Sequence, residues 1–117
     1  MRWAGWRVIG LGVAIAAFAG SGAGFAAGDA RAGRSLVGRL WSGCHAVAAG
    51  QTSKHPAAPA FVEVVRRYPP EHLAEALAEG IMVGHRPITM PEFSFTPAEI
   101  DDILAYLAAL RRSEGIR

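Results

Sequence analysis

Cys44 is the only cysteine of the chain, and this count limits what so short a sequence can fold into. A single thiol excludes an internal disulfide. The part of the chain expected to fold has about 90 residues, and a core of that size is rarely stable without a disulfide, a metal or a bound cofactor. The sequence therefore predicts one domain whose core is completed by a bound group.

The first 27 residues have the composition of a secretory signal peptide. Arg2 and Arg7 precede a stretch from Val8 to Ala27 that carries no charge and is rich in small and apolar residues. A basic start, an apolar middle and a small-residue end are the layout of such a leader, so we expect cleavage after Ala26 or Ala27 and export to the periplasm. An uncleaved membrane anchor is the alternative, because about 20 apolar residues can span a bilayer. The domain then covers residues 28–117.

The charge balance does not favour a nucleic-acid partner. The chain has 12 basic and 10 acidic residues. Arg2 and Arg7 leave with the leader, so the mature part has 12 − 2 = 10 basic residues against 10 acidic ones and is formally neutral. Proteins that bind nucleic acids through their surface usually carry a basic patch, which this balance does not support.

The five residues from Trp41 to His45 have the order W-S-G-C-H. In the haem-attachment motif C-x-x-C-H, two thiols bond to the haem vinyl groups and the adjacent imidazole binds iron. Here Cys44 and His45 match the second half of the motif, and Trp41 occupies the position of the first cysteine. The sequence therefore allows one thioether to haem and not two. A zinc site is disfavoured, because one cysteine and scattered histidines lack the usual ligand spacing.

Two helices and a short amphipathic segment are predicted in the first two thirds of the mature chain. Asp29 is a suitable N-cap for a helix that runs to about Trp41. A loop and the amphipathic segment 60–67 follow. A second helix opens at Pro70 or Glu71, with Leu73, Leu77 and Ile81 inward and Glu71, Glu75 and Glu79 outward, and Gly80 as its C-terminal stop.

The last helix has the clearest start signal in the chain. Thr96 can cap it, Pro97 suits its first position and Glu99 completes a capping box. Its apolar stripe consists of Ile100, Ile103, Leu104, Leu107 and Leu110. No segment alternates like a β-strand, so the predicted fold class is all-α.

From Gly28 to Leu110 the chain resembles a small class I c-type cytochrome. The opening residues 28–33 place Gly33 twelve residues before His45, as in that family, and residues 90–100 look like its methionine loop followed by its last helix. The resemblance implies a cytochrome c-like fold, with three to four helices around one haem c and the first and last helices crossing. It also implies that Gly33 permits this crossing, against an aromatic residue that matches Tyr106.

The resemblance implies a role for each candidate site residue. Cys44 would attach haem covalently, and His45 would bind the iron as the proximal ligand. Met90 would be the distal ligand, with His85 as the alternative. The carbonyl of Pro59, or in its place that of Pro56, would accept the second ring N–H of the proximal imidazole.

Trp41 departs from the family pattern and is expected to pack against the unattached vinyl edge of the haem, or simply to be the last core residue of its helix. A Met/His ligand pair raises the reduction potential, whereas two histidines lower it. His55 and His72 are expected on the surface.

These residues predict a periplasmic one-electron carrier rather than an enzyme, because two protein ligands leave no iron position for a substrate. The expected partners are redox proteins, with the chain as a monomer that meets a membrane only if the leader stays attached. The alternative is a degenerate module that binds haem weakly or not at all and acts in interaction or assembly. A thiol enzyme built on Cys44 and His45 is disfavoured, because adjacent helical residues diverge and no third orienting residue is evident.

Overall fold

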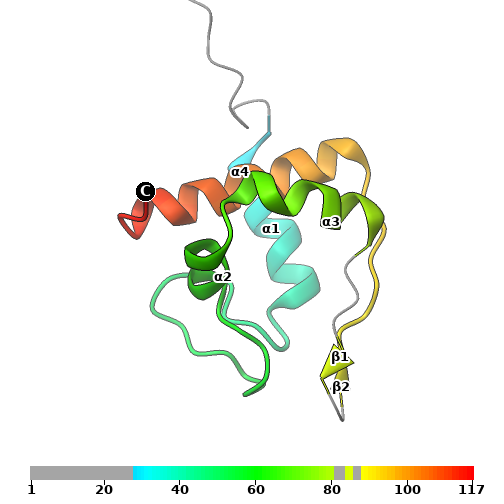
Figure 1. Cartoon of the computed structure of the whole chain (residues 1–117), viewed down its shortest axis with the longest axis vertical. Helices are drawn as coiled ribbons and strands as arrows, with labels where there is room; N and C mark the ends of the chain where they lie inside the picture. Colours follow the sequence, from blue (N-terminus) through cyan, green and yellow to red (C-terminus); the bar gives the residue numbers. More distant parts are fainter. Residues whose placement is uncertain (1–27, 81–83, 86–87) are drawn as a thin grey trace, which may run out of the picture.

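The protein is described here from a computed structural model, which covers residues 28–80, 84–85 and 88–117. The expected leader, Ile81 and Pro87 lie outside these residues, and for His85 only the backbone is described. The described part is helical, which confirms the all-α class (Figure 1). Its elements in chain order are α1 (Ala30–Trp41), α2 (Phe61–Arg67), the 3-10 helix η2 (Pro70–Leu73), α3 (Ala74–Glu79), β1 (Gly84–His85), β2 (Ile88–Thr89) and α4 (Pro97–Ser113).

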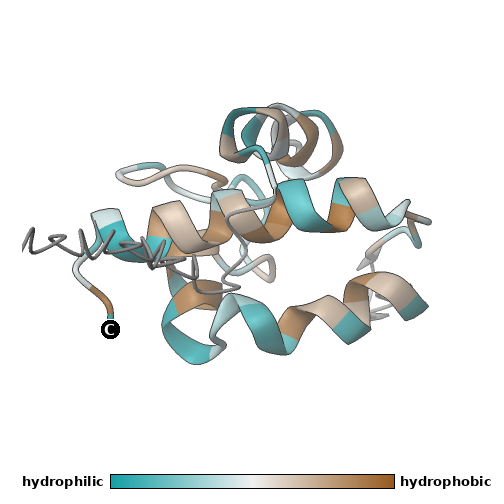
Figure 2. Ribbon diagram, turned by 90° about the horizontal axis from the view of Figure 1, so that it is seen from above, coloured by the Kyte–Doolittle hydropathy of each residue, from teal (hydrophilic) through white to brown (hydrophobic). Residues whose placement is uncertain are grey.

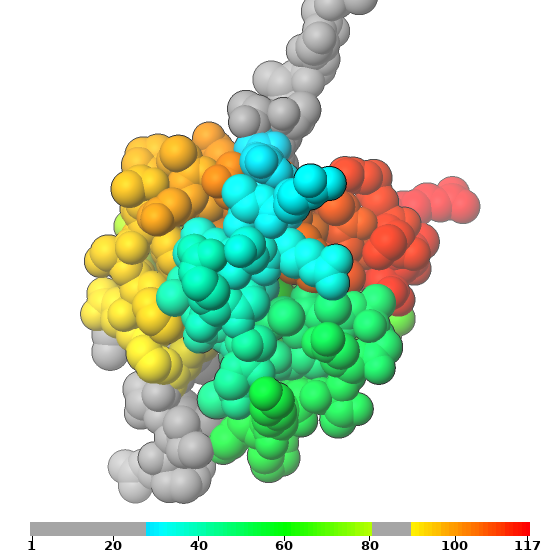
Figure 3. Space-filling view, turned by 180° about the vertical axis from the view of Figure 1, so that it is seen from behind, coloured from blue at the N-terminus to red at the C-terminus, as the bar shows by residue number. Residues whose placement is uncertain are grey.

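The first and last helices cross in close contact at Gly33. A Cβ atom added at Gly33 would lie 1.9 Å from the carbonyl oxygen of Asp102 and 3.0 Å from the Cβ of Tyr106. Only glycine allows two helix backbones to approach this closely. The expected contact between Gly33 and Tyr106 is therefore confirmed, and Figure 3 shows α1 lying across α4.

Side-chain caps fix where these two helices begin. The Asp29 carboxylate accepts hydrogen bonds from the backbone N–H groups of Arg31 (2.9 Å) and Ala32 (3.2 Å). Thr96 and Glu99 form the predicted capping box: the Glu99 N–H donates to the Thr96 hydroxyl (3.2 Å), and the Thr96 N–H donates to the Glu99 carboxylate (2.8 Å). These bonds satisfy N–H groups that have no partner inside the helix.

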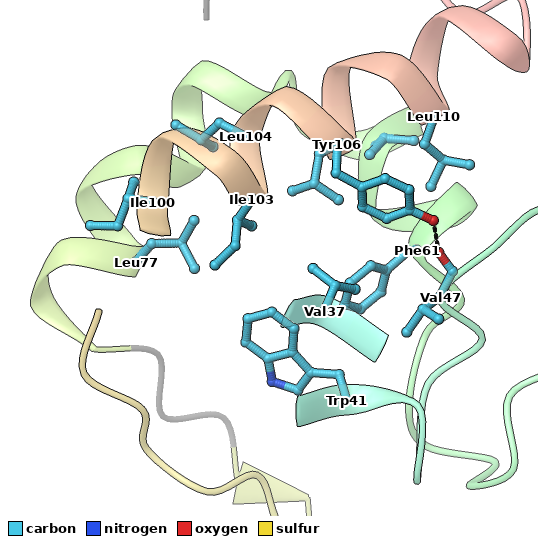
Figure 4. Close-up of a cluster of buried hydrophobic side chains, with 12 residues drawn as sticks. Val37, Trp41, Val47, Phe61, Leu77, Ile100, Ile103, Leu104, Tyr106 and Leu110 are labelled. Atoms are coloured by element: carbon cyan, nitrogen blue, oxygen red, sulfur yellow. Dashed lines mark hydrogen bonds between the residues drawn. The ribbon is translucent and has the colours of Figure 1, made fainter. Parts of the chain in front are cut away.

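The core surrounds α4, which runs between α1 and α3 (Figure 2). Five consecutive residues of α4, from Ile103 to Leu107, are buried, because neighbouring elements cover more than one side of the helix. The remaining core side chains come from α1, α2 and α3, from the loop after α1 and from the rest of α4 (Figure 4). They include Val37, Trp41, Val47, Phe61, Val65, Leu77, Ile100 and Leu110.

The second predicted helix is divided in the structure. Residues 70–73 form the 3-10 helix η2, and only residues 74–79 are α-helical. The two prolines at positions 69 and 70 cannot donate backbone hydrogen bonds, which suits a short helical turn at the start. Leu77 is buried, Leu73 packs against the core, and Gly80 ends α3 with φ of +94°, a conformation that favours glycine.

Two features in the middle of the chain add to the predicted pattern. The amphipathic segment predicted over residues 60–67 is the helix α2, which begins at Phe61. Between α3 and α4, β1 and β2 pair in antiparallel register, with Gly84 opposite Thr89 and His85 opposite Ile88. Strands of two residues carry no alternation that a sequence pattern could reveal.

A buried phenol ties α4 to the loop that follows α1. The Tyr106 hydroxyl donates a hydrogen bond to the backbone carbonyl of Val47 (Figure 4). Burial raises the pKa of Tyr106 above 10.0, although Arg34 opposes the shift. Because the folded state holds this proton more tightly than the unfolded state, the stability that it contributes is present below pH 10 and is lost as the pH rises through the raised pKa.

We expect Tyr106→Phe to lower the free energy of unfolding by about 1 kcal/mol at pH 7, because the Val47 carbonyl loses its donor. The difference from the unmodified protein should shrink above pH 10, where the phenol ionises more readily in the unfolded chain. Urea unfolding of both proteins at pH 7 and pH 11 measures this. A difference that stays constant between the two pH values would contradict the assigned pKa shift.

Candidate functional site

An apolar cavity of ≈ 360 Å³ lies between the last turn of α1, the α2 region and α4. Its volume is in the range of cofactor sites, about 300–1,000 Å³. The described residues that line it include no lysine, arginine, aspartate or glutamate. They are Leu40, Trp41, Gly43, Cys44, His45, His55, Ala57, Ala58, Pro59, Phe61, Val64, Tyr68, Leu73, Leu77, Met90, Pro91, Ile103 and Leu107.

A tight turn at the end of α1 brings Cys44 and His45 to this cavity. The Trp41 carbonyl accepts hydrogen bonds from the backbone N–H groups of Cys44 (3.1 Å) and His45 (2.8 Å). Cys44 is exposed and His45 is half-buried, and both line the cavity. One turn therefore presents a thiol and an imidazole to the same apolar space.

The orientation of the His45 ring is fixed by a backbone carbonyl. Its Nδ1 lies 2.7 Å from the carbonyl oxygen of Pro59. A carbonyl can only accept a hydrogen bond, so Nδ1 carries a proton, and Nε2 is the nitrogen that can bind a metal. Histidines that bind metals are held in this way by a second partner. The structure thus brings together His45 and the expected Pro59, whereas Pro56 is exposed and does not line the cavity.

Three hydrogen bonds close the loop that carries Pro59. The His55 N–H donates to the Cys44 carbonyl (3.1 Å), and the Phe61 N–H donates to the Ala46 carbonyl (2.8 Å). The Ala46 N–H donates to the Ser53 hydroxyl (2.9 Å). The Phe61 ring also lies 5.4 Å from the His45 ring, between centroids. The imidazole is therefore held by the loop and by α2.

Met90 reaches the same cavity from a distant part of the sequence. It follows β2, is half-buried and packs against the core. Pro91 follows it and restricts its backbone to extended conformations. The described residues therefore place a thioether sulfur, a thiol and an imidazole around one apolar space. The His85 side chain lies outside the described part, so the choice between Met90 and His85 as distal ligand stays a prediction.

Trp41 lines the cavity from the last position of α1, and only 6% of its surface is exposed. It packs against three phenylalanine rings at centroid distances of 5.8 Å (Phe61), 5.8 Å (Phe93) and 5.7 Å (Phe95). Its buried indole Nε1–H has no hydrogen-bond partner among the described residues. Trp41 is thus a core residue and a wall of the cavity at the same time.

His55 and Tyr68 line the cavity, although the sequence analysis did not assign them to the site. His55 was expected on the surface, but it is half-buried and lines the cavity, because its backbone N–H is held by the Cys44 carbonyl. Tyr68 also lines it and is half exposed. Neither residue belongs to a spacing motif, so no sequence signal identified it. His72 is exposed, as expected.

The residues around the cavity fit a haem group. An apolar wall suits a porphyrin, a neutral imidazole with a free Nε2 and a methionine thioether are iron ligands, and an accessible thiol can form a thioether. By contrast, the described residues contain no group of three or more His, Cys, Asp or Glu side chains placed to hold a metal ion directly. None of the described helices has the length and hydrophobicity required to cross a bilayer.

Comparisons of the chain with protein-family models, curated proteins and solved structures found no match.

Proposed function

We propose that the protein is a periplasmic one-electron carrier that holds one haem c, with His45 and Met90 as axial ligands and a single thioether at Cys44. One observation carries this proposal: Cys44, His45 and Met90 line the same apolar cavity, and the Pro59 carbonyl leaves only the Nε2 of His45 free to bind iron. The bound haem would exchange one electron between its ferrous and ferric states.

The residues of the chain define how that exchange is tuned. The apolar wall would surround the haem, and the hydrogen bond from Nδ1 to the Pro59 carbonyl would make the His45 ring a stronger iron ligand. The soft thioether of Met90 favours ferrous iron and raises the reduction potential. If His45 and Met90 both bound the iron, no iron position would remain for a substrate, and this favours electron transfer over catalysis.

The location also supports covalent attachment. The leader expected over residues 1–27 would direct the chain to an oxidising compartment, where an exposed free thiol such as Cys44 would be open to disulfide formation or oxidation. A thioether to haem would protect the thiol. Export, attachment and redox activity are therefore parts of the same proposal.

Mass spectrometry of intact protein from its native periplasm tests the proposal. We expect the mass of the chain without residues 1–26 or 1–27, increased by one haem. Acid–acetone extraction should leave the haem on the protein. A correctly processed protein that is colourless and does not bind added haemin would exclude the electron-carrier function and would favour the degenerate-module alternative.

Replacing Cys44 with serine should convert the haem from covalently to non-covalently bound. The thiol is the only one in the chain, so Cys44→Ser removes any possibility of a thioether. We expect essentially all haem to be extracted by acid–acetone from this variant, while His45 and Met90 still give a low-spin spectrum before extraction. Ser42→Ala is the matched control on the same turn and should keep its haem. Haem that resists extraction from Cys44→Ser would contradict the assigned thioether.

A further inference from the structure

The segment from Met90 to Thr96 connects β2 to α4 without forming a helix or a strand. Its side chains alternate in exposure: Met90, Phe93 and Phe95 are half-buried and pack against the core, while the residues between them are exposed. A segment with no regular backbone hydrogen bonding is held by its side chains. Phe93 and Phe95 are therefore the main anchors of the segment that carries Met90.

Both anchors pack on the same side chain, Trp41. The rings of Trp41 and Phe93 are nearly perpendicular (86°), and those of Trp41 and Phe95 are tilted by 55°. Phe93 and Phe95 also contact each other, with centroids 6.3 Å apart. Such aromatic pairs stabilise a structure beyond the apolar area that they bury. In Figure 3 the yellow 90–96 region lies beside the end of α1, which agrees with these contacts.

Trp41 also contacts the proximal side of the cavity. Its carbonyl holds the turn of Cys44 and His45, and its ring packs on Phe61, which in turn packs on the His45 ring. One residue therefore touches both the structure that orients His45 and the segment that carries Met90. Figure 4 shows its indole at the edge of the buried cluster, beside Phe61 and Val37.

Hydrogen bonding does not explain a tryptophan at this position. The buried Nε1–H has no partner among the described residues, and an unsatisfied buried donor lowers stability. What the indole provides is a large apolar ring in contact with three phenylalanines. This ring stands at the position where the haem-attachment motif has its first cysteine.

We infer that Trp41 is a positioning residue for the distal ligand: its contacts with Phe93 and Phe95 hold Met90 at the iron in place of the constraint that a second thioether would add. This inference rests on the proposed function. Loosening the aromatic contact should free Met90 from the iron while Cys44 keeps the haem attached. The effect should appear as easier displacement of Met90 by an added ligand rather than as loss of haem.

Ferric protein titrated with imidazole tests the inference, with Met90 ligation followed by the far-red sulfur-to-iron charge-transfer band. Trp41→Leu keeps an apolar side chain but removes the ring. We expect this variant to bind imidazole at least about 10-fold more tightly than the unmodified protein, because Met90 is held less firmly at the iron. A tenfold change corresponds to a loss of about 1.4 kcal/mol from the Met90 bond. Phe93→Leu removes the other ring of the same contact and should also increase the affinity for imidazole. Trp41→Phe keeps an aromatic ring at this position, and its affinity for imidazole should stay within about threefold of that of the unmodified protein.

Leu110→Ala is the matched control, because Leu110 is buried in α4 but does not line the cavity. It should lower the midpoint of unfolding, because it leaves a cavity in the core, and it should leave imidazole binding unchanged. An unchanged affinity in Trp41→Leu, or an equal increase in Leu110→Ala, would overturn the inference while the haem of the unmodified protein still supports the proposed function. A colourless unmodified protein would instead overturn the proposed function, and the inference with it.

Discussion

Replacing Gly33 with alanine should unfold much of the protein at physiological temperature. The added Cβ would lie 1.9 Å from the carbonyl oxygen of Asp102, whereas carbon–oxygen contacts are normally about 3.3 Å or longer. Neither partner can move aside alone, because both belong to helix backbones. The helices α1 and α4 must therefore separate, with a loss of about 3 kcal/mol or more, which lowers Tm by on the order of 15 °C in a domain of this size.

Gly38→Ala is the control on the same helix. Beyond the neighbouring residues and backbone of its own helix, no atom lies within 4 Å of a Cβ at Gly38, and alanine is the better helix former by about 0.5–1 kcal/mol. Thermal unfolding followed by circular dichroism should therefore show a lower Tm for Gly33→Ala and an equal or higher Tm for Gly38→Ala. Similar Tm values for the two variants would show that the close crossing is not needed for stability.

Replacing His45 with glycine should remove the proximal ligand that we propose for the iron and leave a space that imidazole can fill. The Cys44 thioether would keep the haem in place, so the variant should be coloured but should lose the low-spin spectrum. Added imidazole should restore the low-spin spectrum, with half-saturation near 1 mM, equivalent to about 4 kcal/mol of binding energy. The Pro59 carbonyl, freed from His45, remains as an acceptor for the added ring.

His72→Ala provides the comparison, since His72 is exposed on η2 and does not line the cavity. Its absorption spectrum should match that of the unmodified protein with and without imidazole. If His45→Gly kept a low-spin spectrum before imidazole was added, His45 would not be the proximal ligand, and another histidine near the cavity, such as His55, would be the first to examine.

The sequence was most informative where a local pattern has one structural solution. Thr96, Pro97 and Glu99 form the expected capping box, and Gly80 ends its helix as predicted. Two further contacts were expected from the resemblance and not from composition, and both are present. They are the contact of Gly33 with Tyr106 and that of the His45 ring with the Pro59 carbonyl.

Non-local side-chain contacts were not predictable from the same patterns. Trp41 was expected to end a helix, but its packing on Phe93 and Phe95 depends on how an irregular segment more than 50 residues away folds back. His55 was assigned to the surface because its loop is polar, and a single backbone bond to Cys44 brings it to the cavity instead. Haem ligation, export and electron transfer remain predictions that the experiments above address.

Every bond that orients the His45 imidazole comes from a continuous stretch of the chain, from the Trp41 carbonyl to the Phe61 N–H. Closing loops this short has a small entropic penalty, and the penalty grows only slowly with loop length. Met90, by comparison, is separated from this stretch in the sequence by α2, η2, α3, β1 and β2. The position of the His45 nitrogen thus depends on residues near it in the sequence, whereas the position of the Met90 sulfur depends on the complete tertiary structure. Partial unfolding should therefore displace the Met90 sulfur first.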